Sequence, residues 1–229
     1  MPGRAGAAKT IVIGGHFDGH DIGEAAIDNG TGIAFVMELA DLFAPHARVF
    51  GVHLRFMGFD AEEMGLLGSK AYVDGLAAGK RLDSLAAVFN LDCPIGQDHE
   101  RIGVNGHEEL LPVLAPIGER EPELARIETK VSTASDHFPF VLAGIPGVYQ
   151  YGAGDDPRLG RGVTHTSADT FDKINFSRAK PALATAASVL LRLASADPFP
   201  GRRFSPDEVQ KTLAGPVEEA LKAQKEWPF

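Results

Sequence analysis

The sequence predicts an α/β fold in which helices cover both faces of a mostly parallel sheet. Short apolar runs alternate along the chain with segments of helical periodicity, which is the element order of such folds. The runs are nearly continuous in apolar residues, as in strands buried on both faces. With 229 residues, 44% of them hydrophobic, the chain can bury one core, and we expect residues 1–229 to form a single domain.

Four apolar runs have the length and composition of buried strands. In chain order they are Thr10–Gly15, His53–Phe59, Leu85–Leu91 and Ile145–Tyr151. The fourth contains Pro146 and Gly147, which are both unfavourable in a strand interior, so it is the weakest of the four predictions.

The first two helices are expected between these strands. In Gly30–Phe43, the apolar residues Ile33, Val36, Met37 and Ala40 recur at helical spacing and predict the buried face. Either Asn29 or Thr31 can cap its first turn. The second helix is expected to begin at Ala61 and to run to Ala77.

The later helices follow from the same periodicity. Leu110–Glu119 is a short helix, and Asn175–Ala196 is a long one in which Pro181 marks a kink or the true start. Residues 200–229 form a C-terminal helical extension, in which Ser205 caps a helix that has Pro206 at its first position. The tail after it is expected to pack on the body of the protein or on a partner.

Composition excludes several classes of function. The net charge of −9, without a basic stripe, argues against binding to nucleic acid or an anionic membrane. No apolar run approaches the roughly 20 residues of a membrane span. The opening MPGRAGAAKT lacks the apolar region of a signal peptide, so the chain as written is expected to be cytoplasmic. A lone cysteine, Cys93, excludes an internal disulfide and a multi-cysteine zinc site.

Acidic and imidazole side chains follow each of the four predicted strands. In open α/β sheets ligands bind outside the carboxyl ends of the strands, so these side chains are expected to meet at one edge. In strand order the residues are His16 and Asp18, then Asp60, Glu62 and Glu63, then Asp92, and finally His165 and Asp169.

Carboxylates gathered this closely repel one another unless a cation neutralises them, which favours one or two divalent metal ions. Imidazole and carboxylate donors without thiolate suit zinc, with manganese and cobalt as alternatives, and they are typical of catalytic rather than structural sites. Asp28 lies just before a helix start and is the candidate bridge between two ions. Glu62 is the candidate general base, and Asp18 is expected to accept the free ring N–H of His16.

The stretches GGHFD, DNGTG, FDAEEMGLLGS, NLD and THTSADT resemble, in order and spacing, the motifs of the zinc aminopeptidase family with two co-catalytic metals. That family includes bacterial leucyl aminopeptidases and glutamate carboxypeptidases, and glutaminyl cyclases share its fold. The resemblance covers Thr10 to Phe176 and implies a three-layer sandwich around a mixed sheet. It implies Glu62 as the base, and as metal ligands His16 and Asp92 on one ion, Glu63 and His165 on the other, and Asp28 on both.

Other segments extend or depart from this resemblance. The stretch SDHFPFVLAGIPG resembles a pocket-lining segment, in which Asp136 and His137 face substrate or support the ligands. The segment Gln97–Val131 is expected to contribute to substrate selection. Thr164 stands where many relatives have tyrosine, and relatives carry a longer stretch before their first strand, often with a signal peptide. Two possibilities therefore stay open: that the N-terminus is incomplete, and that the protein is extracellular.

The resemblance implies a zinc-dependent exopeptidase, with aminopeptidase as the favoured activity, that acts on a peptide or small amide. Two alternatives stay open: a glutaminyl-peptide cyclotransferase with one zinc, and a non-catalytic binding module of the same fold. The full ligand set favours hydrolysis with two metals over both. The sequence leaves open the choice between aminopeptidase, dipeptidase and carboxypeptidase specificity, and also the oligomeric state.

Overall fold

A six-stranded mixed sheet forms the centre of the computed structural model, which describes residues 1–120, 125–154, 158 and 160–229. The strand order is β2-β1-β3-β6-β4-β5, and every neighbouring pair is parallel except β4 and β6. This arrangement confirms the mixed, mostly parallel sheet. The strands are β1 (Thr10–His16), β2 (His53–Phe59), β3 (Leu85–Leu91), β4 (His99–Gly103), β5 (Ala125–Glu128) and β6 (Gly147–Ala153).

The four strands expected from the sequence are all present, and β6 begins at Gly147, after Pro146. The short strands β4 and β5 were not expected. Both form one edge of the sheet, where β4 runs antiparallel to β6 with Arg101 opposite Tyr151. Only part of each is buried, so neither has the continuous apolar run by which the central strands were identified.

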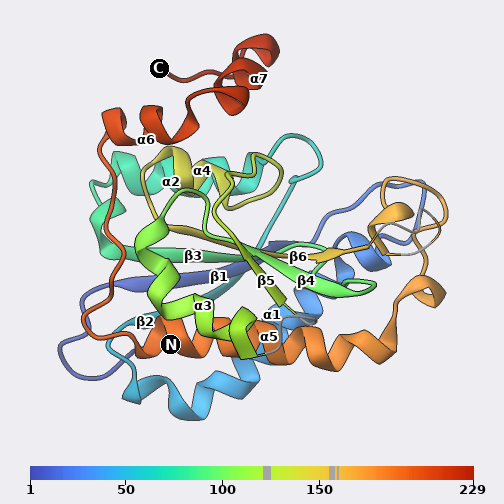
Figure 1. Cartoon of the computed structure of the whole chain (residues 1–229), viewed down its shortest axis with the longest axis horizontal. Coiled ribbons are helices and arrows are strands. Elements are labelled where there is room, and N and C mark those ends of the chain that lie inside the picture. Colours follow the sequence, from blue (N-terminus) through green and yellow to red (C-terminus); the bar gives the residue numbers. More distant parts are fainter. Residues whose placement is uncertain (121–124, 155–157, 159) are drawn as a thin grey trace.

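Helices cover both faces of the sheet, as expected (Figure 1). Apolar residues of α1, α3 and α5 pack on one face with the side chains of Ile11 and Ile13, and those of α2 and α4 pack on the other with Val12. The helices are α1 (Thr31–Phe43), α2 (Leu67–Ala78), α3 (Leu111–Arg120), α4 (Phe138–Leu142), α5 (Phe176–Ser195), α6 (Pro206–Leu213) and α7 (Pro216–Gln224).

The buried face of α1 only partly matches the expected one. Phe35, Val36, Leu39 and Phe43 face the sheet, whereas Met37 is 66% exposed. Both faces of the helix carry apolar residues, so periodicity alone did not decide which face the bulky side chains would bury.

The second helix begins later than expected, at Leu67 instead of Ala61. Ala61, Gly65 and Leu66 all have positive φ angles, of 55°, 104° and 60°. A right-handed helix cannot pass through such residues, so Glu62 and Glu63 lie in a turn between β2 and α2. The long helix α5, in contrast, starts before Pro181 and contains it.

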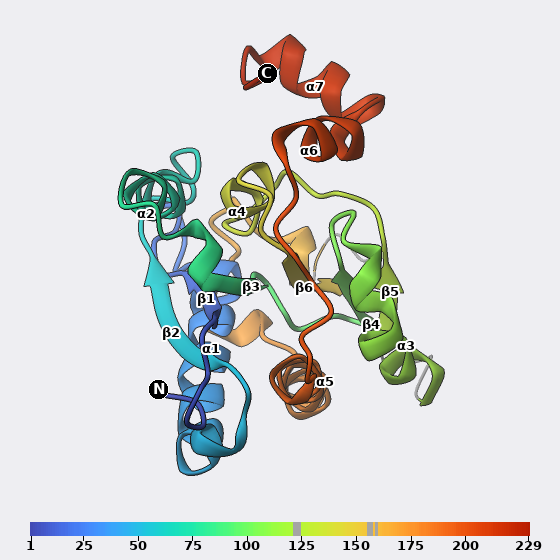
Figure 2. The same cartoon turned by 90° about the vertical axis from the view of Figure 1, so that its left-hand side faces the viewer.

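The C-terminal extension forms two helices beyond α5. The segment that joins α5 to α6 crosses past one end of the sheet, so α6 and α7 lie beyond α4 on the opposite side from α5 (Figure 2). Ser205 caps α6 in a capping box with Glu208, and Pro206 occupies the first turn, as expected. In the described part of the chain, none of the helices has the length and apolar character to cross a bilayer.

Candidate metal centre

The carboxyl ends of the parallel strands bring most of the predicted acidic and imidazole residues together, whereas Asp60 is exposed and accepts the N–H of Ala61. His16 is the last residue of β1, and Asp92 directly follows β3. Glu62 and Glu63 follow β2 in the turn before α2. His165 reaches the same place from the segment beyond β6. Residues that are far apart in the sequence thus meet at one edge of the sheet, as expected.

Asp28 lies between two histidines. Its Oδ1 is 3.2 Å from His16 Nε2, and its Oδ2 is 3.2 Å from His165 Nε2. His16 Nε2 is also 3.7 Å from Asp92 Oδ1. One ligand atom from each of His16, Asp28 and Asp92 lies within 4.8 Å of the others. Each oxygen of the Asp28 carboxylate therefore faces a different imidazole, as a bridging ligand requires.

Glu63 joins the second histidine. Its Oε2 lies 3.2 Å from His165 Nε2 and 3.0 Å from His20 Nε2. The rings of His20 and His165 are 4.4 Å apart between centroids. His20 was not among the residues expected at the centre, because its position depends on a contact with a residue far along the chain. A third imidazole is thus available on this side of the centre.

Negative charge dominates the centre. Burial lowers the pKa of His16, but the carboxylates of Asp28 and Asp92 outweigh this effect and raise the pKa to about 11. Burial raises the pKa of Glu62 to about 8, and the charge of Asp92 adds to the shift. The His16 Nε2 atom is buried and makes no hydrogen bond within the described residues. A buried ring nitrogen that faces two carboxylates at 3.2 and 3.7 Å without a hydrogen bond is placed as a metal ligand would be.

Two neighbours that are not proposed as metal ligands, Asp169 and Asn29, hold Asp28 in place. The buried Asp169 carboxylate accepts the backbone N–H groups of Ile27 at 2.7 Å and Asp28 at 3.0 Å. Asn29 Oδ1 accepts the N–H of Cys93 at 3.0 Å, and Asn29 Nδ2 donates to the carbonyl of Leu91 at 2.9 Å. Asp169 therefore fixes the Asp28 backbone, and Asn29 ties it to the end of β3.

Asp18 accepts the ring N–H of His16 as expected, but through its backbone carbonyl and not through its carboxylate. The ring N–H at Nδ1 of His16 donates to the backbone carbonyl of Asp18 at 3.1 Å, while the nearer carboxylate oxygen is 3.5 Å away. That carboxylate instead accepts the N–H groups of Glu62 at 3.0 Å and Glu63 at 3.2 Å. Asp18 therefore orients His16 through its main chain and holds the turn of the two glutamates through its side chain.

Asp136 and His137 are both fully buried, which fits the second of the two expected roles, support of the ligands, better than contact with substrate. Burial raises the pKa of Asp136 to about 7 and lowers that of His137 to about 4. His137 Nε2 donates to the carbonyl of Ser132 at 3.0 Å, and its ring stacks on Tyr149 at 4.4 Å. His137 therefore supports the loop that carries Ser132, and Asp136 lies close enough to His16 and Asp92 to feel their charges.

Two residues beside Asp92, Tyr149 and Arg161, were not predicted from the sequence. The Tyr149 hydroxyl donates to Asp92 Oδ2 at 3.4 Å, and Arg161 Nη1 donates to that hydroxyl at 3.4 Å. Thr164 does not supply the hydroxyl of the missing tyrosine, because its Oγ1 donates to the carbonyl of Arg161 at 3.0 Å. Thr164 thus fixes the turn that carries Arg161, and the polar group beside Asp92 comes from β6.

Comparison with known proteins agrees with this geometry. The sequence profile of peptidase family M28 matches residues 1–190. The chain belongs to peptidase family M28. Among its relatives is leupeptin-inactivating enzyme 1 of Streptomyces exfoliatus, 33% identical over 60% of this chain and 31% of that protein. Aminopeptidase YwaD of Bacillus subtilis is 28% identical over 77% of this chain and 40% of its own length.

A solved structure extends the similarity of this M28 chain to the fold. The aminopeptidase from Aneurinibacillus sp. strain AM-1 superposes with a TM-score of 0.68 and 26% identity, over 86% of this chain and 45% of that one. The M28 chain thus spans less than half the length of the relatives described here. The profile match ends at residue 190, so α6 and α7 lie outside it.

Proposed function

We propose that this M28 chain is the catalytic part of a zinc-dependent aminopeptidase with two ions at its centre. The observation that carries the proposal is the position of Asp28, whose two carboxylate oxygens each lie 3.2 Å from a different histidine. A two-metal site needs such a shared carboxylate between ions about 3.5–4 Å apart. Two of the relatives compared above are named aminopeptidases, which supports the same reaction here.

The donor set fits zinc. His16 and Asp92 would hold one ion and Glu63 and His165 the other, with Asp28 shared, and the set has no thiolate. Imidazole and carboxylate ligands are those of catalytic zinc sites, and manganese or cobalt suit the same donors. The buried Nε2 of His16 and Oε1 of Glu63 make no hydrogen bond within the described residues, which leaves both atoms available as ligands.

Glu62 is the proposed general base. Ions bound at the centre supply a Lewis acid that polarises the scissile carbonyl and makes an attacking water more acidic. The Glu62 carboxylate lies among the ligand atoms of His16 and Glu63 but is not needed to complete either pairing. It accepts the proton of the attacking water and passes it to the leaving amine nitrogen. The N–H bonds to Asp18 hold the turn from which it acts.

Replacement of Glu62 separates its role from that of the ligands. We expect Glu62→Gln in the zinc-loaded chain to keep its metal content by elemental analysis and to lose about 10²–10⁴-fold in kcat on an aminoacyl reporter amide. Glu38→Gln, an exposed residue on α1, is the matched control and is expected to keep full activity. A Glu62→Gln variant as active as this control would show that Glu62 is not the base.

Metal stoichiometry tests the two-ion proposal itself. We expect two zinc ions per chain, loss of hydrolysis on chelation, and recovery on adding zinc. One ion per chain, together with cyclisation of an N-terminal glutamine peptide in place of hydrolysis, would replace the proposal with a cyclotransferase. A panel of aminoacyl, N-blocked and C-terminal reporter peptides separates aminopeptidase from carboxypeptidase specificity.

A further inference from the structure

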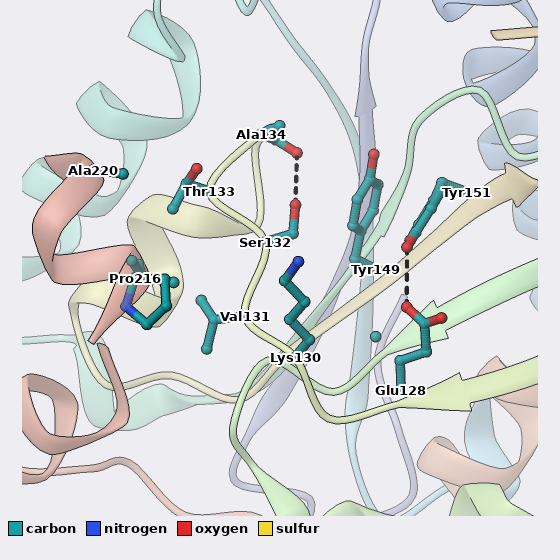
Figure 3. A pocket seen from close by; sticks show the side chains of 12 residues that line it. Glu128, Lys130, Val131, Ser132, Thr133, Ala134, Tyr149, Tyr151, Pro216 and Ala220 are labelled. Atoms are coloured by element: carbon teal, nitrogen blue, oxygen red, sulfur yellow. Dashed lines mark hydrogen bonds between the residues drawn. The ribbon is translucent and has the colours of Figure 1, made fainter. Parts of the chain in front are cut away.

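A pocket of about 360 Å³ lies between the segment Lys130–Ala134 and the C-terminal helix α7 (Figure 3). Its size falls within the roughly 300–1,000 Å³ that is usual for small-molecule sites. Tyr149 and Tyr151 of β6 line one side, and Pro216 and Ala220 of α7 line the other. None of the residues that line this pocket has a role in the proposed hydrolysis.

One residue connects the pocket to the metal centre. The side chain of Tyr149 lines the pocket, while its hydroxyl donates to Asp92 Oδ2 at 3.4 Å. The same ring stacks on Tyr151 at 4.9 Å and on His137 at 4.4 Å, so it is fixed from both faces. The same side chain therefore lines the pocket and contacts a proposed metal ligand.

The pocket carries an uncompensated positive charge. Lys130 points into it, towards Ser132 and Tyr149 (Figure 3), and its ammonium has no ion-pair partner among the described residues. The acid in the lining, Glu128, is already engaged, because it pairs with Arg101 at 3.0 Å and accepts from the Tyr151 hydroxyl at 3.0 Å. The charge left to meet a ligand is that of Lys130.

The C-terminal extension completes the pocket. Leu221 and Val217 of α7 pack in one apolar cluster with Val131 and Phe138, next to the pocket-lining segment. Leu221 is 2% exposed, so α7 packs against the rest of the protein through this side chain. The family match ends at residue 190, so α7 forms a wall of the pocket that lies outside it.

We propose that this pocket binds a carboxylate of the peptide substrate through Lys130, and that α7 closes it around that group. The inference rests on the proposed peptidase function and names its substrate class: peptides that carry a free carboxylate near the scissile bond. The carboxylate belongs either to an acidic side chain or to the C-terminus of a dipeptide, since both present the same chemistry to an ammonium.

The first experiment measures kcat/KM of the zinc-loaded full chain on glutamyl and glutaminyl reporter amides, and on leucyl-alanine and its C-terminal amide. One member of each pair lacks the carboxylate. We expect at least one pair to show about a tenfold or greater preference for the acid. The pair that shows it identifies the source of the carboxylate. Equal rates within both pairs would overturn the inference.

Variants assign the preference to the pocket. We expect Lys130→Met to abolish the preference, whereas Lys180→Met, an exposed lysine on α5, leaves it unchanged. Ala220→Trp is expected to lower kcat/KM on the acidic substrate by filling the pocket from α7. Ala223→Trp on the same helix, outside the lining, is its control. A preference that survives both Lys130→Met and Ala220→Trp contradicts the proposal.

Binding without turnover separates this inference from the proposed function. Calorimetric titration of glutarate into the chelator-treated protein is expected to show binding that Lys130→Met removes and Lys180→Met retains. If wild type hydrolyses no amide but binds glutarate through Lys130, the peptidase proposal fails and the carboxylate site stands. If neutral amides are hydrolysed but glutarate does not bind, the carboxylate site fails alone.

Discussion

The buried carboxylate of Asp169 offers a sharp test of how the centre is held together. Asp169 is 3% exposed, and it accepts the N–H of Ile27 at 2.7 Å and that of Asp28 at 3.0 Å. In Asp169→Ala both buried N–H groups lose their acceptor. A hydrogen bond to a charged group contributes about 1.5–3 kcal/mol, so the loss of two predicts destabilisation by about 3–6 kcal/mol. Asp169→Asn keeps one acceptor oxygen and is expected to lose about half as much.

The same substitution is expected to act on the metal centre, because the backbone of Asp28 loses its anchor. Changes in groups that support ligands typically cost 10–100-fold in metal affinity, and we expect a decrease of that order for zinc. Asp172→Ala, an exposed aspartate on the same segment, serves as the control. The two effects should appear together in Asp169→Ala and should both be absent in the control.

Urea unfolding of the chelator-treated protein measures the first effect, and competition with a chromophoric zinc chelator measures the second. At about 2–4 °C per kcal/mol for a chain of this size, Tm should fall by on the order of 10 °C. If Asp169→Ala unfolds within about 0.5 kcal/mol of wild type and binds zinc equally well, the two hydrogen bonds do not position Asp28, and the reasoning is wrong.

Two further predictions concern parts outside the centre. Ser205→Ala removes the cap of α6 and is expected to cost about 1 kcal/mol in urea unfolding, whereas Ser177→Ala at an exposed position is expected to cost less than half of that. Burial lowers the pKa of His107 below 6.5, against the opposing effect of Glu109, so the folded state favours the neutral ring. Stability that is fully present above pH 6.5 should therefore fall as the pH drops below that value, and His107→Gln should flatten this decline in urea midpoints measured from pH 7.5 to 5.

The central strands and the residues gathered at the candidate centre could be predicted from the sequence for one physical reason. Each parallel strand is buried on both faces, so its run is continuously apolar, and the polar residue that directly follows must lie at the sheet edge. His16 and Asp92 were identified in this way. The assignment of ligand pairs came from the family resemblance, and the geometry around Asp28 agrees with it.

Features that depend on long-range contacts or on unusual backbone angles could not be predicted. The turn with Glu62 and Glu63 has a helical composition, but positive φ angles at Ala61 and Leu66 end any helix there, and the resulting turn is held by N–H bonds to Asp18. His20 reaches the centre only through the tertiary fold. The pocket beyond Tyr149 required the position of α7, which no local pattern specifies.

The centre exists only in the folded chain, which links its chemistry to its stability. Its proposed ligands come from separate strand ends, so an unfolded chain cannot present them together, and every ion bound stabilises the fold by mass action. Without ions the same carboxylates repel one another. The hydrogen bonds of Asp169 and Asn29 must then hold Asp28 against that repulsion. Residues that never contact substrate should therefore control activity through the arrangement of the ligands.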